Sequence, residues 1–151
     1  MDGYIEKLDL LNERYDGIQE SYDKLAQVEN DFEKFRREFD GEEPIRYYRE
    51  KFHWVIFNYL EVLLIFEKKL YSEKGKEEYY NLKKNYAKFF HDYRRGIIKL
   101  SIECVLEMLQ FLNRLYDIIA TEMKQLVIEV DEIKENLDKD RNINCIKNSI
   151  P

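Results

Sequence analysis

The chain has 151 residues, of which 44% are hydrophobic and 37% charged, and a formal net charge of −6. This length provides for one hydrophobic core, and the scarcity of glycine (five) and proline (two) favours long helices over a sheet. Two cysteines, Cys104 and Cys145, exclude a disulfide framework, so a reducing, cytoplasmic location is expected.

Residues 2–39 are predicted to form the first helix. Its apolar residues alternate three- and four-residue spacings, as in a coiled coil: Leu8, Leu11, Tyr15, Ile18, Tyr22, Leu25 and Phe32. Because this stripe is narrow and the other faces are charged, one partner helix should cover it. Residues 40–44, Asp-Gly-Glu-Glu-Pro, predict a turn, since glycine suits a helix end and proline a helix start.

Residues 44–72 are predicted to form the second helix. The stretch 54–66 is apolar nearly all round, so it is expected to be the most buried element of the protein. It is too short to cross a bilayer, which takes about 20 residues, and no membrane span is expected. The acidic, amphipathic N-terminus also predicts no secretory signal.

A third helix is predicted over residues 76–94. Its apolar stripe consists of Tyr79, Leu82, Tyr86, Phe89, Phe90 and Tyr93. At 100° per residue, the opposite face is basic and forms a candidate docking face: Lys84, Lys88, His91, Arg95 and, further on, Lys99.

The last helix carries the most regular pattern in the chain. Its heptad seam has twelve apolar positions spaced by four and three residues: Ile98, Ile102, Val105, Leu109, Leu112, Tyr116, Ile119, Met123, Leu126, Val130, Ile133 and Leu137. Such a seam requires a second helix along its length. We expect Ile98 to Val130 to form an interface with a second copy of the chain or with another helical protein.

Gly96 leaves the path of the chain open. Because the third-helix stripe continues beyond it, we expect one helix from 76 to about 138, with a kink at Gly96. The alternative is a break at this glycine, which gives an up-down-up-down bundle with the start of the first helix beside the end of the last. Either way, the sequence predicts an all-α antiparallel bundle of three to four long helices with coiled-coil packing, over residues 1–138, and a mobile tail at 139–151.

Charge is unevenly distributed along the chain. Residues 1–43 have a net charge of −8, whereas residues 68–99 have a net charge of +6. The simpler interpretation is that the acidic first helix packs beside the basic third helix. The alternative is that the basic segment is a docking surface for an acidic partner.

Motifs for catalysis or metal binding are weak. Glu50 and His53 have the spacing of a di-iron ligand pair, but the chain lacks the second pair that such a site requires. Glu103 and Glu107 are expected to be a solvated strip. We therefore predict a non-enzymatic assembly or adaptor protein with no cofactor and no metal.

Two alternatives are kept. The segment His91-Asp92-Tyr93-Arg94 resembles the phospho-accepting segment of quorum-sensing-type histidine kinases, which implies phosphotransfer through His91. The resemblance covers four residues, and Arg95 and Gly96 depart from the pattern. The basic face of residues 84–99 could instead bind nucleic acid, although the acidic chain as a whole opposes this.

Overall fold

The computed structural model describes the backbone of residues 2–39 and 45–149, and the side chains of residues 3–39 and 46–142. Four helices make up nearly all of this part of the chain: α1 (Asp2–Glu38), α2 (Ile45–Glu67), α3 (Glu73–Arg94) and α4 (Ile102–Ser149). The described residues contain no β-strand, and the predicted all-α bundle is confirmed.

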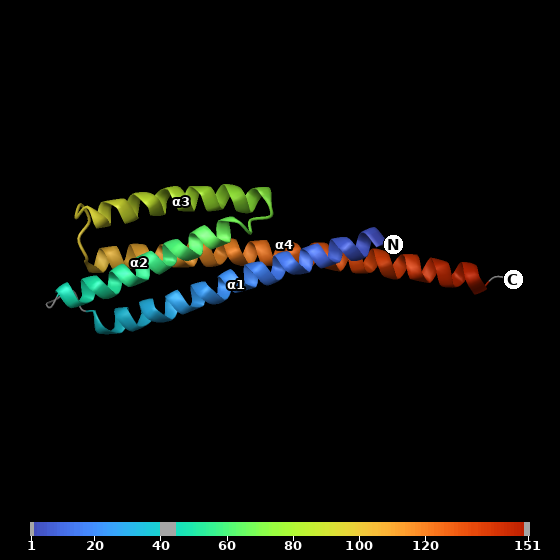
Figure 1. Ribbon diagram of the computed structural model, residues 1–151, viewed down its shortest axis with the longest axis horizontal. Helices are drawn as coiled ribbons and strands as arrows, with labels where there is room; N and C mark the ends of the chain where they lie inside the picture. The colour runs from blue at the N-terminus through green and yellow to red at the C-terminus, as the bar shows by residue number, and fades with distance from the viewer. Residues whose placement is uncertain (1, 40–44, 150–151) are drawn as a thin grey trace.

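The helices run alternately up and down (Figure 1). α1 packs beside α4 and α2, and α3 packs beside α4. Beyond the turn that joins α2 to α3, only α1 and α4 continue side by side. We call this two-helix part, residues 2–13 and 130–137, the stem, and α4 continues beyond it without α1. The topology is the up-down-up-down alternative, with the start of α1 beside the second half of α4.

The heptad seam of α4 is covered by α1 of the same chain. The ring centroids of Tyr22 and Tyr116 lie 5.4 Å apart, which fixes the antiparallel register. Since both helices rise about 1.5 Å per residue, Asp2 lies near the level of residue 136. The apolar seam stops at Leu137, so its length matches the reach of α1.

Alternate positions of the seam differ in burial. One row is buried in the core along α4: Val105, Leu112, Ile119, Leu126 and Ile133. The other row is partly buried at Leu109, Tyr116, Met123 and Val130 and buried at its last member, Leu137. Ile98, which precedes α4, is partly buried. Ile102, at the start of α4, is exposed. A homodimer through this seam, as predicted, would require α1 to move away, so the seam is not an open interface in this structure.

The prediction of one continuous helix through Gly96 is wrong. α3 ends at Arg94, and Gly96 has a left-handed φ of +76°. The Gly96 N–H donates to the Tyr93 carbonyl at 3.1 Å, and the Ile97 N–H donates to the Asp92 carbonyl at 2.9 Å. These are the hydrogen bonds of a Schellman motif, in which glycine closes the helix.

α4 begins at Ile102 with a cap of its own. The Ser101 Oγ accepts a hydrogen bond from the Cys104 N–H at 3.2 Å, which satisfies one free donor of the first turn. This serine lies five residues after Gly96, across an intervening apolar segment. The apolar spacing continues across the connection between α3 and α4, where the chain reverses direction. For this reason the spacing did not reveal the helix break.

The turn between α2 and α3 is fixed to α4 by a buried carboxylate. Glu122 has no exposed surface. Its carboxylate accepts hydrogen bonds from the Tyr71 N–H at 2.6 Å, the Ser72 N–H at 3.1 Å and the Ser72 hydroxyl. The same hydroxyl accepts from the Gly75 N–H at 2.9 Å and caps α3. The buried charge is thus matched by donors, as a buried charge requires.

The other side of this turn is fixed to α1. Lys69 donates to the Gly17 carbonyl at 3.0 Å and lies 3.3 Å from the Glu20 carboxylate. Lys69 and Lys24 both lower the pKa of Glu20, with the Lys69 hydrogen bond as the largest cause. Together with Glu122, these contacts hold the turn against both helices at the base of the stem.

Three tyrosines in the core donate their hydroxyls to helical carbonyls. The pairs are Tyr59 to Phe111 at 2.6 Å, Tyr79 to Leu63 at 2.6 Å and Tyr86 to Ile56 at 2.5 Å. Burial raises the pKa of all three hydroxyls, so they remain donors at neutral pH. Aromatic packing with satisfied polar ends therefore ties α2 to α3 and α4.

Three further predictions concern the turn at 40–44, the C-terminal tail and the absence of a membrane span. The turn predicted at 40–44 lies outside the described residues. α4 extends to Ser149, past the helix end predicted at 138–144, and so includes most of the segment predicted as a mobile tail. Among residues 2–39 and 45–149, no helix is long and apolar enough to span a membrane.

Candidate protein-interaction surface

The outer face of α2 carries large apolar side chains that no other helix covers. Trp54, Phe57 and Leu64 are 64%, 44% and 47% exposed. The prediction that 54–66 is the most buried element is therefore wrong for this face. The other side of α2 is in the core, where Phe52, Ile56, Tyr59, Leu63 and Phe66 have no exposed surface. α2 has apolar residues all round, but the bundle buries only one side of it.

Two hollows lie beside Trp54, in the groove between α1 and α2. One, of about 280 Å³, is lined by residues that include Val28 and Asn58. The other, of about 210 Å³, is lined by residues that include Phe35 and Lys51. The indole of Trp54 borders both hollows. An aromatic side chain between two hollows is the arrangement expected of an anchor residue in a protein interface.

A third hollow, of about 540 Å³, lies between α2 and α3. Leu60, Ala87 and Phe90 supply its apolar lining, and His91, Arg94 and Arg95 supply its cationic end. We call it the α2–α3 groove.

Aromatic rings order the cationic end of the α2–α3 groove. The rings of Phe57 and Phe90 meet edge to face, with centroids 5.1 Å apart. The Arg94 guanidinium carbon lies 5.6 Å from the Phe57 centroid and 5.7 Å from that of Phe90. Contacts at these distances are in the cation–π range and hold the guanidinium beside the two rings.

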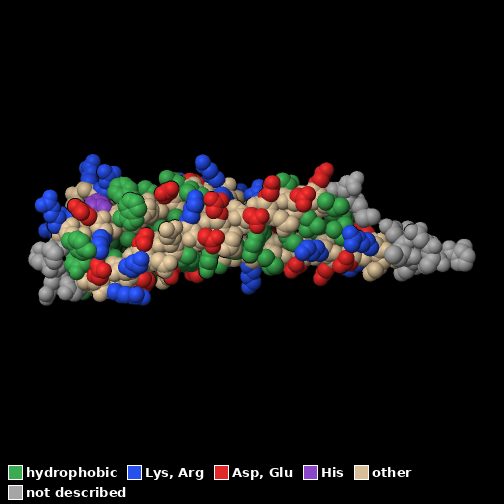
Figure 2. Space-filling view, turned by 60° about the horizontal axis from the view of Figure 1, so that its bottom comes forward, with side chains coloured by type: hydrophobic (Ala, Val, Ile, Leu, Met, Phe, Trp, Pro, Cys, Tyr) green, Lys and Arg blue, Asp and Glu red, His purple; other side chains and the backbone are tan. Residues whose placement is uncertain are grey.

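The basic face predicted from the sequence is on the surface. All five of its residues are exposed: Lys84, Lys88, His91, Arg95 and Lys99. Within the described residues, none of them forms an ion pair with an acidic side chain at 4.0 Å or less. In Figure 2, Lys and Arg side chains gather beside a histidine at the end away from the stem, whereas Asp and Glu side chains crowd the middle.

The simpler interpretation of the charge asymmetry is wrong. α1 and α3 are diagonal in the bundle, and their described residues make no contact with each other. Lys69, in the turn before α3, does pair with Glu20 of α1. The acidic first helix therefore neutralises the start of the basic segment but leaves the cations of α3 without an acidic neighbour from α1.

His53 lies in the positive potential of Arg94 and Arg49 at this end of the molecule. Its pKa is lowered from the usual 6.5 by burial first, and then by the charges of Arg94 and Arg49. The His53 ring lies 5.2 Å from that of Tyr93, and its Nδ1 and the Tyr93 hydroxyl are buried without a hydrogen-bond partner among the described atoms. A neutral imidazole is therefore favoured here.

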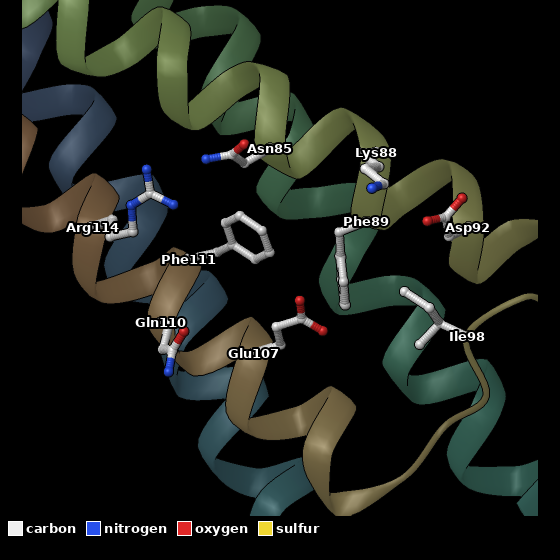
Figure 3. A pocket seen from close by; sticks show the side chains of 9 residues that line it. All are labelled: Asn85, Lys88, Phe89, Asp92, Ile98, Glu107, Gln110, Phe111 and Arg114. Atoms are coloured by element: carbon white, nitrogen blue, oxygen red, sulfur yellow. The ribbon is translucent and has the colours of Figure 1, made fainter.

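A fourth hollow, between α3 and α4, has a volume of about 410 Å³ (Figure 3). Phe89 and Phe111 point into it from the two helices. Its polar lining combines two cations with two carboxylates and two amides: Lys88, Arg114, Asp92, Glu107, Asn85 and Gln110. Since both signs of charge are present, the lining gives no preference for an anion or a cation.

The described residues contain no group of three or more His, Cys, Asp or Glu side chains placed to hold a metal ion. Glu50, Glu103 and Glu107 are exposed, as the solvated strip was predicted to be. Cys104 is buried, and burial raises the pKa of its thiol to about 12, which disfavours the reactive thiolate.

Comparison with protein families, with curated proteins and with solved structures found no match.

The exposed face of α2 was not predicted, although the sequence carries a signal for it. Glu50, Asn58 and Glu61 lie within a turn or two of Trp54 and, at 100° per residue, share its side of the helix. Polar residues around a tryptophan on one face indicate solvent rather than core. The α2–α3 groove gave no comparable signal, because it depends on Ala87 of one helix facing Leu60 of another.

Proposed function

We propose that this protein is a non-enzymatic adaptor or assembly protein that works by binding a helical protein partner. The observation that supports this proposal is the exposed face of α2, where Trp54, Phe57 and Leu64 present apolar surface between two hollowed grooves. Large exposed aromatic groups cost solubility, and in soluble proteins such patches are typical of interaction sites.

The basic face of α3 adds a source of specificity. It adjoins the exposed face of α2 through Phe90 and Arg94, so an apolar contact and a charged contact are available on one side of the bundle. Charged rims select partners and steer association, while apolar anchors supply most of the affinity. The heptad seam has a structural role, because it holds α1 to α4.

Site-specific photo-crosslinking tests this proposal. A photoreactive amino acid at Glu61, which lies on the exposed face of α2, should form a discrete adduct with a partner protein in the cell. Trp54→Arg in the same chain should abolish the adduct. The control places the same group at Leu106, which is exposed on α4. Equal adducts at both positions, or no adduct at Glu61, would contradict the proposal.

Nucleic-acid binding is the second candidate function. It is favoured by the exposure of Lys84, Lys88 and Lys99 without acidic partners in the described part of the chain. A labelled single-stranded oligonucleotide at low salt tests it by fluorescence anisotropy. Binding that Lys84→Glu with Lys88→Glu abolishes would support this candidate, and the absence of binding at low salt would remove it.

Phosphotransfer through His91 remains a weaker alternative. The structure leaves His91 exposed on the basic face, which a phospho-accepting histidine would need. Incubation with a phosphorylated receiver domain should then give an acid-labile label that His91→Gln abolishes.

A further inference from the structure

The α2–α3 groove has the shape of a helix-binding groove. Ala87 of α3 faces the larger Leu60 of α2, and its small side chain leaves the hollow of about 540 Å³ open to solvent. The groove follows two antiparallel helices, so a third helix laid along it would pack as helices do within a bundle. Apolar side chains spaced by three and four residues on that helix would enter the hollow.

The groove carries positive charge without acidic compensation. His91, Arg94 and Arg95 lie at one end, and none is ion-paired within the described structure. The nearest acids in sequence line other hollows: Asp92 lines the one between α3 and α4, and Glu61 lines the one between α1 and α2. The acidic helix α1 is diagonal to α3. An occupant with acidic side chains would therefore meet cations that the bundle itself leaves free.

Arg94 is placed to meet a carboxylate. Its guanidinium carbon lies within cation–π distance of the rings of Phe57 and Phe90, and these contacts restrict the group to the edge of the groove. A guanidinium held in this way loses little freedom on binding and can donate two parallel hydrogen bonds to one carboxylate. The lowered pKa of His53 is consistent with a positive local potential.

We propose that the α2–α3 groove binds an acidic amphipathic helix of a partner protein, with its aliphatic side chains over Leu60 and Ala87 and its carboxylates on Arg94 and Arg95. This assignment rests on the proposed function and specifies the chemistry of the partner. It uses one side of α2 only, so Trp54 and the groove toward α1 are not required for it.

An unbiased selection tests the assignment. A display library of random helical peptides is selected on the whole protein, and enriched peptides are measured by fluorescence anisotropy. Enriched sequences should be amphipathic helices rich in Glu and Asp. Ala87→Leu, which fills the hollow without changing charge, and Arg95→Glu should each weaken their binding by about tenfold or more, and high salt should weaken it too.

The controls separate the groove from general electrostatics and from loss of folding. Lys124→Glu with Lys134→Glu reverses two exposed charges of α4, well after its first turn, and should leave peptide affinity within about twofold. Circular dichroism melts of Ala87→Leu and Arg95→Glu should match those of the wild type, because both positions are exposed. Arg94→Gln, which keeps the packing on the rings, should weaken binding less than Arg95→Glu with Arg94→Gln combined.

Three results would overturn the assignment. The first is enrichment of neutral or basic peptides, or no enrichment at all. The second is peptide binding that Ala87→Leu leaves unchanged. The third is a wild-type dimer in light scattering that Ala87→Leu dissociates, which would assign the groove to a second copy. If the crosslink at Glu61 persists in Ala87→Leu and Arg95→Glu, the groove assignment fails while the proposed function stands.

Discussion

Gly75 lies so close to Glu122 that a Cβ on this glycine would overlap the buried carboxylate. A Cβ built there would also lie 2.9 Å from the Ser72 Oγ. Gly75 is the third residue of α3, and its own N–H donates to that hydroxyl. The glycine is therefore required by space rather than by backbone conformation, since its φ is not among the positive values.

Gly75→Ala should destabilise the protein. The added methyl group would push Glu122 off the N–H groups of Tyr71 and Ser72 and leave a buried carboxylate with fewer donors. Overpacking of this kind costs about 1–3 kcal/mol of unfolding free energy, as measured by urea denaturation. Replacing glycine with alanine elsewhere in a helix raises the unfolding free energy, so a decrease at this position indicates the overlap with Glu122.

Gly3→Ala provides the matched control. Gly3 lies in α1 with no described atom within 4 Å of its built Cβ. The substitution should stabilise the protein by at most about 1 kcal/mol, because alanine has the higher helix propensity. If Gly75→Ala were equally stabilising, the contact between the α2–α3 turn and α4 would not be as described.

The backbone at Gly96 leads to a second prediction. Gly96→Ala should cost about 1–2 kcal/mol, because an L-residue with a side chain is strained at φ +76°. No described atom lies within 4 Å of the built Cβ, so the cost belongs to the backbone alone. Gly96→Asn should cost less, since asparagine tolerates this conformation. Unfolding midpoints that rank alanine above asparagine would contradict a left-handed residue at this position.

The sequence predicts those features of the fold that depend on residues close together in the chain. The seam of α4 and the stripe of α1 are regular patterns, and they predicted two long helices that require cover. These patterns could not show that α1 and α4 cover each other, because that pairing depends on the direction of the chain after Gly96. The Schellman closure there needs one glycine, but the apolar spacing on both sides continued past it.

The candidate surface was predicted only in part. The wheel placed Lys84, Lys88 and His91 on the polar side of the third helix, and the structure exposes all three. It could not show that the acidic first helix lies diagonal to them. The burial of Glu122 could not be predicted either, because the donors that satisfy its carboxylate come from a turn about 50 residues away.

The environment of His53 predicts a specific response to mutation. Its folded-state pKa is below 6.5, so the unfolded chain binds the proton more readily and stability is lost as pH falls from 6.5 through that pKa. Arg94→Gln removes one positive neighbour and should raise the pKa of His53. It should not restore 6.5, because burial is the largest cause. NMR titration of the imidazole protons measures the change.

Lys124→Gln serves as the control for this titration. Lys124 is exposed near the middle of α4, and the same loss of one positive charge there should leave the His53 pKa unchanged. Equal shifts in the two variants would mean that net charge, rather than the guanidinium beside Phe57, sets the potential at His53. A bound acidic helix should raise the His53 pKa in the wild type as Arg94→Gln does.

Trp54 is the only tryptophan, so its fluorescence reports on the outer face of α2 alone. Because 64% of the side chain is exposed, acrylamide should quench its emission nearly as well in the folded protein as in urea. Trp54→Ala should change the unfolding free energy by less than about 1 kcal/mol, as surface substitutions do. Phe66→Ala, on the buried side of the same helix, should cost about 3–5 kcal/mol. A blue-shifted emission protected from acrylamide at low protein concentration would place Trp54 in a core and remove the apolar face on which the proposed function depends.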